Sequence, residues 1–141
     1  MATSPPADGD ELAASDERPV VALSVISDGI ARLHKEYYGK GPEQAKTHLA
    51  GGDAVFCVLR GGFTVIERTL IDDGKSEDVE RVRRSFQQTM RRPFVAIVEN
   101  ATGRKVAAYM SQVHADPDIA VEIFILEPRD ADGDRGILSA A

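Results

Sequence analysis

The stretch SEDVERVRRSFQQTMRRPFVAIVENATG, residues 76–103, decides the fold because it has the longest amphipathic pattern in the chain. Its apolar residues recur at steps of three and four, which is the spacing of one helix face. They are Val79, Val82, Phe86, Met90, Phe94 and Ile97. Because the residue before Pro93 resists helical geometry, a strand from Phe94 to Val98 competes with the helix. The stripe keeps its phase through Ile97, so we predict one kinked continuous helix that stops at Gly103.

A second apolar stripe near the N-terminus predicts another helix, which begins near Pro19 and stops at Gly39. Its members are Leu23, Ile26, Ile30, Leu33 and Tyr37. After this helix, proline suits the first position of a short helix from Pro42 to Leu49. The pair Gly51-Gly52 would end that short helix.

Two pairs of strands are predicted after these helices. Ala54 to Leu59 is a nearly continuous apolar run, as in a strand covered on both faces. The glycine turn Arg60-Gly61-Gly62 then leads to a second strand, Phe63 to Ile71, which is rich in β-branched residues. The later pair of strands is Lys105 to Val113 and Ile119 to Leu126.

The order of these elements predicts the architecture. Asp72-Asp73-Gly74 separates the first pair of strands from the quoted stretch, and Ser76 can cap the helix that follows. Each helical stripe must cover a sheet face, so we predict an α+β two-layer sandwich of order α-ββ-α-ββ. Its sheet is four-stranded and mainly antiparallel, with the helices packed on it. The open edges of such a sheet could pair two copies edge to edge into a homodimer.

The charge distribution separates one domain from two tails. Residues 1–18 have a net charge of −4 and residues 129–141 of −1, so residues 19–128 hold only −1 of the total −6. We interpret these segments as a disordered acidic tail, a flexible acidic tail and a single domain, respectively. No apolar run reaches the ~18 residues of a membrane span, and the N-terminus lacks the apolar core of a secretory signal. We therefore expect a cytoplasmic protein, in which the lone Cys57 is a buried hydrophobe.

The stretch Gly39, Lys40, Gly41 and Pro42 is the most suggestive candidate for ligand or partner binding. Glycines around a lysine, before a helix start, could present backbone N–H groups and a positive charge to a phosphate. The stretch is also similar to the GXXG loop of KH domains, with Pro42 in place of the second glycine. A nucleic-acid or nucleotide-binding module is therefore the alternative function, although the nearly neutral body argues against a general nucleic-acid binder. The structural interpretation is a tight connection that uses glycine for positive φ.

Two further charged features are candidates for binding. Arginines lie on the helix face opposite the apolar stripe, namely Arg81, Arg84, Arg91 and Arg92. Arg83 does not lie on that face. Acidic residues four positions away suggest an ordinary solvated face, and only Arg91 and Arg92 lack such neighbours. Glu67 lies in the second expected strand, where it could be a buried acid with a raised pKa or could pair with the neighbours of Arg68 at a strand edge.

His114, Asp116 and Asp118 cluster in the turn between the last two strands and form a weak candidate for a metal site. Turns routinely use aspartate for local hydrogen bonds, which is the structural interpretation. No Ser/His/Asp or Cys/His set occurs at a persuasive spacing. We therefore expect no catalytic residues and no cofactor, and binding rather than catalysis.

Five separated segments share their pattern with a known family. They are IARLHKEYYGKGP (30–42), FTVIERTL (63–70), RSFQQTM (84–90), TGRKV (102–106) and EIFILE (122–127). Together, over roughly residues 20–128, they resemble the MpsC-like family, also called YbcI-like. This is a family of small bacterial proteins assigned to a Na+-translocating membrane-potential-generating system.

The resemblance implies a small accessory or regulatory protein of that cation and inorganic-carbon system, acting by binding. The membrane work of the system belongs to other subunits, so the implied partner is a membrane transporter subunit. The implied location is cytoplasmic and peripheral to the membrane. The family implies no catalytic residues, and the expected functional surface is the Gly39–Pro42 stretch together with Glu67.

Overall fold

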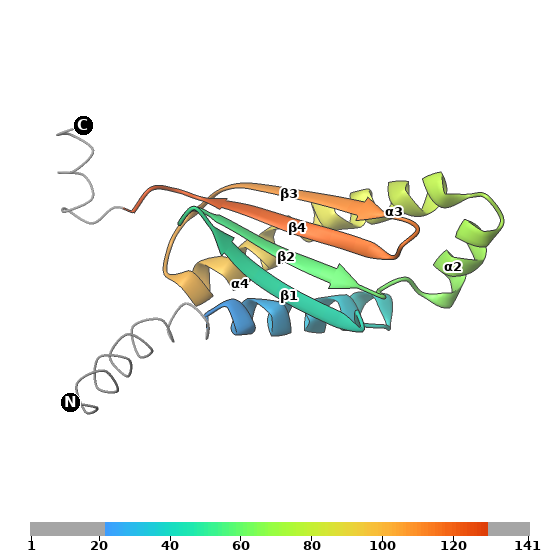
Figure 1. Ribbon diagram of the computed structural model, residues 1–141, viewed down its shortest axis with the longest axis horizontal. Coiled ribbons are helices and arrows are strands. Elements are labelled where there is room, and N and C mark those ends of the chain that lie inside the picture. The colour runs from blue at the N-terminus through green and yellow to red at the C-terminus, as the bar shows by residue number, and fades with distance from the viewer. Residues whose placement is uncertain (1–21, 130–141) are drawn as a thin grey trace, which may run out of the picture.

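The computed structural model describes residues 22–129, which form helices and strands in the order α-ββ-α-α-α-ββ (Figure 1). The first helix is described from residue 22 to residue 38. The labelled elements are β1 (Gln44–Ala50), β2 (Ala54–Arg60), α2 (Val65–Asp72), α3 (Ser76–Thr89), α4 (Arg91–Thr102), β3 (Val106–His114) and β4 (Ile119–Leu126). The predicted α+β sandwich is confirmed. The predicted tail 1–18, and all but the first residue of the predicted tail 129–141, lie outside the described residues.

The four strands form one sheet in the order β1-β2-β4-β3, and every neighbouring pair is antiparallel. β2 and β4 are the central strands, with Cys57 paired to Glu122. A bulge between Val106 and Ala108 shifts β3 against β4. The last two strands agree closely with the predicted pair, and β2 agrees with the predicted apolar strand.

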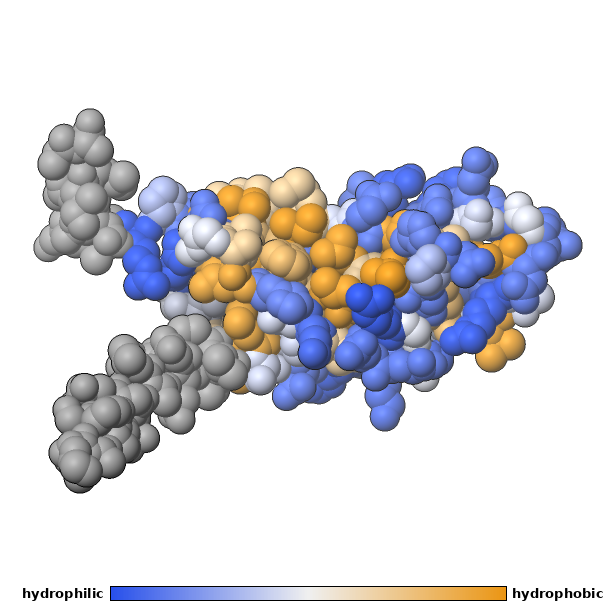
Figure 2. Space-filling view, viewed as in Figure 1, coloured by the Kyte–Doolittle hydropathy of each residue, from blue (hydrophilic) through white to orange (hydrophobic). Residues whose placement is uncertain are grey.

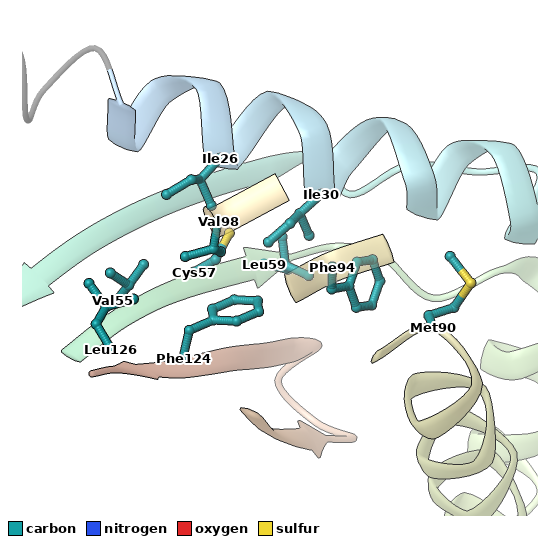
Figure 3. Packing of buried hydrophobic residues seen from close by; sticks show 10 residues of the cluster. All are labelled: Ile26, Ile30, Val55, Cys57, Leu59, Met90, Phe94, Val98, Phe124 and Leu126. Carbon is teal, nitrogen blue, oxygen red and sulfur yellow. The ribbon is translucent and has the colours of Figure 1, made fainter. Parts of the chain in front are cut away.

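The main core lies between the helices and the central strands (Figure 3). Burial of each large apolar side chain contributes about 1.5–3 kcal/mol, so these contacts fasten the first helix and α4 to the sheet. The members, each at most 4% exposed, are Ile26, Ile30, Val55, Cys57, Leu59, Met90, Phe94, Val98, Phe124 and Leu126. Cys57 is fully buried, as predicted, and burial raises the pKa of its thiol to about 11.

The predicted helix Pro42–Leu49 is wrong, because this segment is β1, an edge strand paired with β2. Thr47 turns inward, where its hydroxyl lies 2.7 Å from the Ser27 hydroxyl of the first helix. Gly51 and Gly52 have φ of +63° and +80°, so they form the turn into β2 rather than a helix end. A helix as short as this segment is only marginally stable by itself. The segment forms a strand because it pairs with β2.

The predicted strand Phe63–Ile71 is also wrong, because residues from Val65 onward form α2. A capping box starts this helix: the Thr64 hydroxyl accepts from the Glu67 N–H at 3.2 Å, and the Glu67 carboxylate accepts from the Thr64 N–H at 2.8 Å. These bonds satisfy N–H groups that a first helical turn otherwise leaves free. They outweigh the strand preference of β-branched residues such as Val65 and Ile66.

The predicted continuous helix over residues 76–103 is two helices, α3 and α4, separated by Met90 alone. Met90 has φ −88° and ψ 6°, and Pro93 then falls in the first turn of α4, where its missing N–H is not needed. The competing strand Phe94–Val98 is therefore wrong. Ser76 is the first residue of α3 rather than its cap, whereas Gly103, with φ +71°, ends α4 as predicted.

Each predicted stripe has the right phase but includes one residue that faces solvent. Tyr37 of the first helix is 56% exposed, and Val82 of α3 is 60% exposed. Polar residues are buried in the same helices, namely Ser27 and His34 in the first helix and Arg83 and Gln87 in α3. The buried side chains of these helices are therefore both polar and apolar.

Candidate functional site

Segments far apart in the sequence meet at the turn between β2 and α2, residues 61–64. The Lys40 ammonium donates to the Gly61 carbonyl at 2.5 Å. The Asp118 carbonyl accepts from the Gly61 N–H at 3.1 Å, and its carboxylate accepts from the Phe63 N–H at 3.0 Å. The loop that holds Lys40 and the β3–β4 turn that holds Asp118 are therefore joined through one short segment.

The loop Gly39–Pro42 connects the first helix to β1. Gly39 has φ +80°, which fits the structural role of a tight connection. Pro42 lies beside Gly62, and the Lys40 ammonium already has a carbonyl partner in the same turn. The loop is thus part of the framework at this end of the molecule, and phosphate binding by it stays a prediction.

Glu67 forms a buried ion pair with Arg83, a residue that is only 2% exposed. The guanidinium donates to the two carboxylate oxygens at 2.6 and 2.5 Å and to the Gly62 carbonyl at 2.9 Å. It also lies 3.8 Å above the centre of the Tyr38 ring. Burial works to raise the pKa of Glu67, but the Arg83 guanidinium and the hydrogen bonds with Thr64 lower it overall. The expectation of a raised pKa is wrong, and Arg83 is the cation that pairs with this acid.

The outer side of the same helical turn is apolar and exposed. Val65 is 79% and Ile66 is 73% exposed, next to the inward-pointing Glu67. Val65, Arg68 and Asp72 are spaced i, i+3 and i+7, so they share one face of α2. Arg68 and Asp72 line a cleft of about 450 Å³, whereas Val65 and Ile66 are not among its lining residues.

The cleft lies between α2, the turn after β2 and the β3–β4 turn. Its lining residues are Glu43, Gly61, Phe63, Arg68, Ile71, Asp72, Ala115, Asp116 and Asp118. Four of these are carboxylates, whereas Arg68 is the one cation in the lining and lies 3.9 Å from Glu43. The net charge of the lining is therefore negative, so the cleft favours positively charged groups.

The predicted cluster His114, Asp116 and Asp118 is divided among different contacts. His114 Nδ1 lies 2.9 Å from the Pro117 carbonyl, Asp116 lines the cleft, and Asp118 accepts from the Phe63 N–H. Over residues 22–129, no group of three or more His, Cys, Asp or Glu side chains is arranged to hold a metal ion. The contact of His114 is a local hydrogen bond typical of turns, whereas that of Asp118 ties the turn to a distant segment of the chain.

Arg91 and Arg92 are exposed in the first turn of α4 and are not among the residues that line the cleft. On α3, Arg81 forms an exposed pair with Asp78 at 3.0 Å, as expected of a solvated face. A role in binding for Arg91 and Arg92 stays a prediction.

A second buried carboxyl group, that of Glu122, is not among the predicted site residues. Glu122 is fully buried on β4. It accepts from the Tyr109 hydroxyl, from the Ser111 hydroxyl at 3.0 Å and from the Gln87 amide at 3.4 Å. Burial raises the pKa of Glu122 to about 7, against the lowering effect of these hydroxyls and of Arg83. Glu122 thus has neutral hydrogen-bond partners, unlike Glu67.

Both buried charged residues that the prediction missed had a sequence signal. Glu122 interrupts the apolar run of β4, and Arg83 is the arginine of α3 that does not lie opposite the apolar stripe. Charged residues at inward positions are rarely buried without partners. A search for inward acids and inward cations together would therefore have predicted a polar group between the layers.

These features define a small α+β protein with helices on one face of an antiparallel sheet, polar residues buried between the layers and an acidic cleft at one end. A family model described as Na+-translocating membrane potential-generating system (MpsC) matches residues 22–128. The chain belongs to the MpsC family, as its resemblance predicted. Neither the curated proteins nor the solved structures contain a match to the chain. Within residues 22–129, no helix is both long and apolar enough to span a membrane.

Proposed function

We propose that this protein is an accessory component of the Na+-translocating membrane-potential-generating system, and that it acts by binding a membrane subunit of that system. Membership of the MpsC family supports the choice of system. The observation that supports a binding role is the exposed apolar pair Val65 and Ile66 on α2, a helix that also lines the acidic cleft. In this proposal the protein works at the cytoplasmic surface of the membrane.

The exposed pair is presented on a rigid turn. On its inner side, Glu67 closes the capping box with Thr64 and is held by Arg83. A surface that is ordered before binding loses less conformational entropy when a partner docks. Large apolar side chains held in this way beside a cleft suit an anchor for a partner residue.

The charge of the cleft supports a membrane subunit as the partner. Cytoplasmic segments next to membrane spans are enriched in lysine and arginine. Such a segment would match the carboxylates of Glu43, Asp72 and Asp116, while an apolar residue of the segment contacts Val65 and Ile66. We therefore expect the recognised segment to be basic and to include an apolar residue.

The alternative, nucleic-acid binding through the Gly39–Pro42 loop, has weaker support. The Lys40 ammonium donates to the Gly61 carbonyl, so binding a phosphate would compete with an internal hydrogen bond. The adjoining cleft is also acidic and would repel a phosphate backbone.

The proposal is tested by capture of partners from membranes of the native host. Full-length tagged protein is crosslinked in cells, captured after detergent extraction and examined by mass spectrometry. We expect the wild type to recover an integral membrane subunit, and the Val65→Asp/Ile66→Asp variant to recover at least about tenfold less, which corresponds to about 1.4 kcal/mol.

The matched control is Val82→Asp, which places the same charge at an exposed valine of α3 and should leave capture unchanged. Circular dichroism checks that each variant is folded. Equal capture by the wild type and the double variant, or no membrane subunit with the wild type, contradicts the proposal. Salt-dependent RNA or DNA binding that is lost in Lys40→Ala would support the alternative instead.

A further inference from the structure

Among the described residues, 22–129, none covers the face of the sheet opposite the helices, and this face is largely apolar. Residues that β2 and β4 turn toward the helices are buried, apart from the partly exposed Ala120, whereas those on the opposite face, apart from the exposed Arg60, are partly exposed. Figure 2 shows hydrophobic residues gathered over the strands on this face, with hydrophilic residues around them. The outward residues of the two central strands are Ala54, Phe56, Val58, Arg60, Ile119, Val121, Ile123 and Ile125.

The outer strands extend this face by direct pairing. One row across the sheet is formed by His48, Phe56, Ile123 and Met110. The next row is formed by Lys46, Val58, Val121 and Gln112. No outward position on any of the four strands holds Asp or Glu.

This pattern is unusual for a sheet with one face in water. Antiparallel sheets of that kind normally alternate apolar inward and polar outward residues. The run Ala54–Leu59 is instead typical of a strand covered on both faces, and β4 shows the same composition. Within residues 22–129 the helices cover only one face (Figure 1), so none of the described residues supplies a second cover.

We propose that a second copy of this chain is the second cover, and that two sheets stack face to face in a symmetric homodimer. Four strands about 4.8 Å apart and seven residues long, at about 3.3 Å each, outline a face of roughly 19 by 23 Å. The two faces together have a projected area of about 870 Å², and the relief of the side chains raises the buried area toward the lower end of the roughly 1,200–2,000 Å² of a stable interface. This surface does not include the exposed turn of α2.

The strand register favours one arrangement of the two copies. Stacked sheets keep their strands within about 30° of each other. A two-fold axis parallel to the strands places β2 over the partner's β4, so Phe56 lies over the partner's Ile123 and Val58 lies over the partner's Val121. Near the edges, His48 then lies over the partner's Met110.

The charges on the face agree with this axis. It places Lys46 of one copy over the partner's Gln112, so the ammonium faces a neutral amide. An axis across the strands would instead place β1 over β1 and bring Lys46 toward the partner's His48. The axis parallel to the strands therefore buries the central apolar side chains of each copy without opposing two basic groups.

The proposal is tested with the full-length chain by sedimentation or light scattering over a range of concentrations. We expect a mass of twice 15.2 kDa for the wild type, and a monomer for Ile123→Asp, which places a charge at the centre of the face. Val65→Asp is the control and should stay dimeric, because Val65 lies on α2 outside the face. The control also separates this proposal from the proposed function, which depends on Val65.

A second measurement does not depend on a destabilising charge. His48→Cys and Met110→Cys are made in separate chains, mixed and treated with a short thiol-specific crosslinker. We expect the mixture to give covalent dimers and each variant alone to give few, because the register opposes His48 to the partner's Met110. Buried Cys57 should not react.

Several results would overturn the proposal. A wild type that is monomeric at all concentrations would exclude the dimer, and sedimentation of that monomer with anionic lipid vesicles would assign the face to a membrane. A dimer that survives Ile123→Asp and gives no crosslink in the mixture would show pairing elsewhere, such as the edge-to-edge pairing expected from the sequence. Crosslinking of His48→Cys alone would contradict the proposed axis.

Discussion

At the scale of single residues, Arg83 has the largest structural role. Its guanidinium joins α3 to α2 through Glu67, to the preceding turn through the Gly62 carbonyl and to the first helix through the Tyr38 ring. Arginine suits this position because its planar fork binds a carboxylate in two places and stacks on an aromatic ring at the same time.

Replacement of Arg83 by methionine tests this role. The Arg83→Met variant keeps an unbranched side chain but leaves the Glu67 carboxylate buried without its cation. We expect the free energy of unfolding to fall by about 3–5 kcal/mol, measured by urea denaturation. The double variant Glu67→Gln/Arg83→Met should lose less than the sum of the single variants, because the two residues act as a pair.

The control for this prediction is Arg84→Met, at the neighbouring exposed position of α3, which should change stability by less than about 0.5 kcal/mol. If the two methionine variants lose the same stability, the buried pair does not have the structural role assigned to it.

The raised pKa of Glu122 predicts that the protein loses stability as the pH rises, whereas the lowered pKa of Glu67 predicts a loss as the pH falls. Its pKa in the folded protein is about 7, against an ordinary value of 4.5. Below pH 4.5 the carboxyl is protonated in both states and has no effect. As the pH rises to about 7, the unfolded carboxyl ionises first, so the free energy of unfolding falls by about 3 kcal/mol in total. The pKa of Glu67 is lowered, so its contribution is instead lost as the pH falls.

The variant Glu122→Gln cannot ionise and isolates this effect. Relative to the wild type, its stability should increase by about 3 kcal/mol between pH 4.5 and about pH 7.5, measured by urea denaturation across that range. Glu127→Gln, an exposed change one residue beyond β4, should show no such trend. A constant difference between Glu122→Gln and the wild type would mean that Glu122 titrates with an ordinary pKa.

At the scale of elements, α2 shows how local hydrogen bonds overrule composition. Its sequence, VIERTLID, is rich in β-branched residues and predicts a strand. The capping box of Thr64 and Glu67 starts a helix instead, and Arg83 holds that start from inside. The spacing Thr-x-x-Glu is a sequence signal of a helix start. The strand was predicted because the β-branched composition was given more weight than this signal.

Loss of the cap should therefore weaken α2 in particular. We expect Thr64→Ala to lower the free energy of unfolding by about 1 kcal/mol and to speed hydrogen exchange most strongly in α2. The control is Thr69→Ala within the same helix, where the hydroxyl bonds only the Val65 carbonyl on an exposed side. Its effect should be below about 0.5 kcal/mol, and equal effects of the two changes would contradict the importance of the cap.

At the scale of the whole molecule, the core residues identified within residues 22–129 all come from the segment that the family model matches. Both hydrophobic clusters lie within residues 22–128. We predict that a chain limited to residues 19–128 unfolds within about 2 °C of the full chain, since a change below about 0.5 kcal/mol shifts Tm by no more than this. Differential scanning calorimetry measures the difference. A loss of several degrees would mean that a tail contributes to the fold, contrary to the predicted domain limits.

The sequence alone determined the elements whose pattern repeats over many residues. The stripe from Leu23 onward predicts the first helix, and apolar runs predict β2, β3 and β4. The stripe in residues 76–103 predicts one helix, which the structure divides into α3 and α4. In these segments local preference and burial favour the same structure, because each has enough apolar residues on one face to require the core. The family resemblance was also readable from the sequence, and the family match confirms it.

Only the tertiary structure decided β1 and the polar contacts, and it added Arg83 to the capping box by which the sequence already signals α2. β1 is a strand because β2 offers it hydrogen bonds, and α2 is a helix because its first turn is capped and held by Arg83. The pairing of Arg83 with Glu67, the burial of Glu122 and the meeting of the Lys40 loop with Asp118 depend on residues distant in sequence. Periodicity reports which face of a segment is apolar, but it does not report which other segment that face will meet. For this reason the sequence predicted the layers, and the fold alone assembled the candidate site.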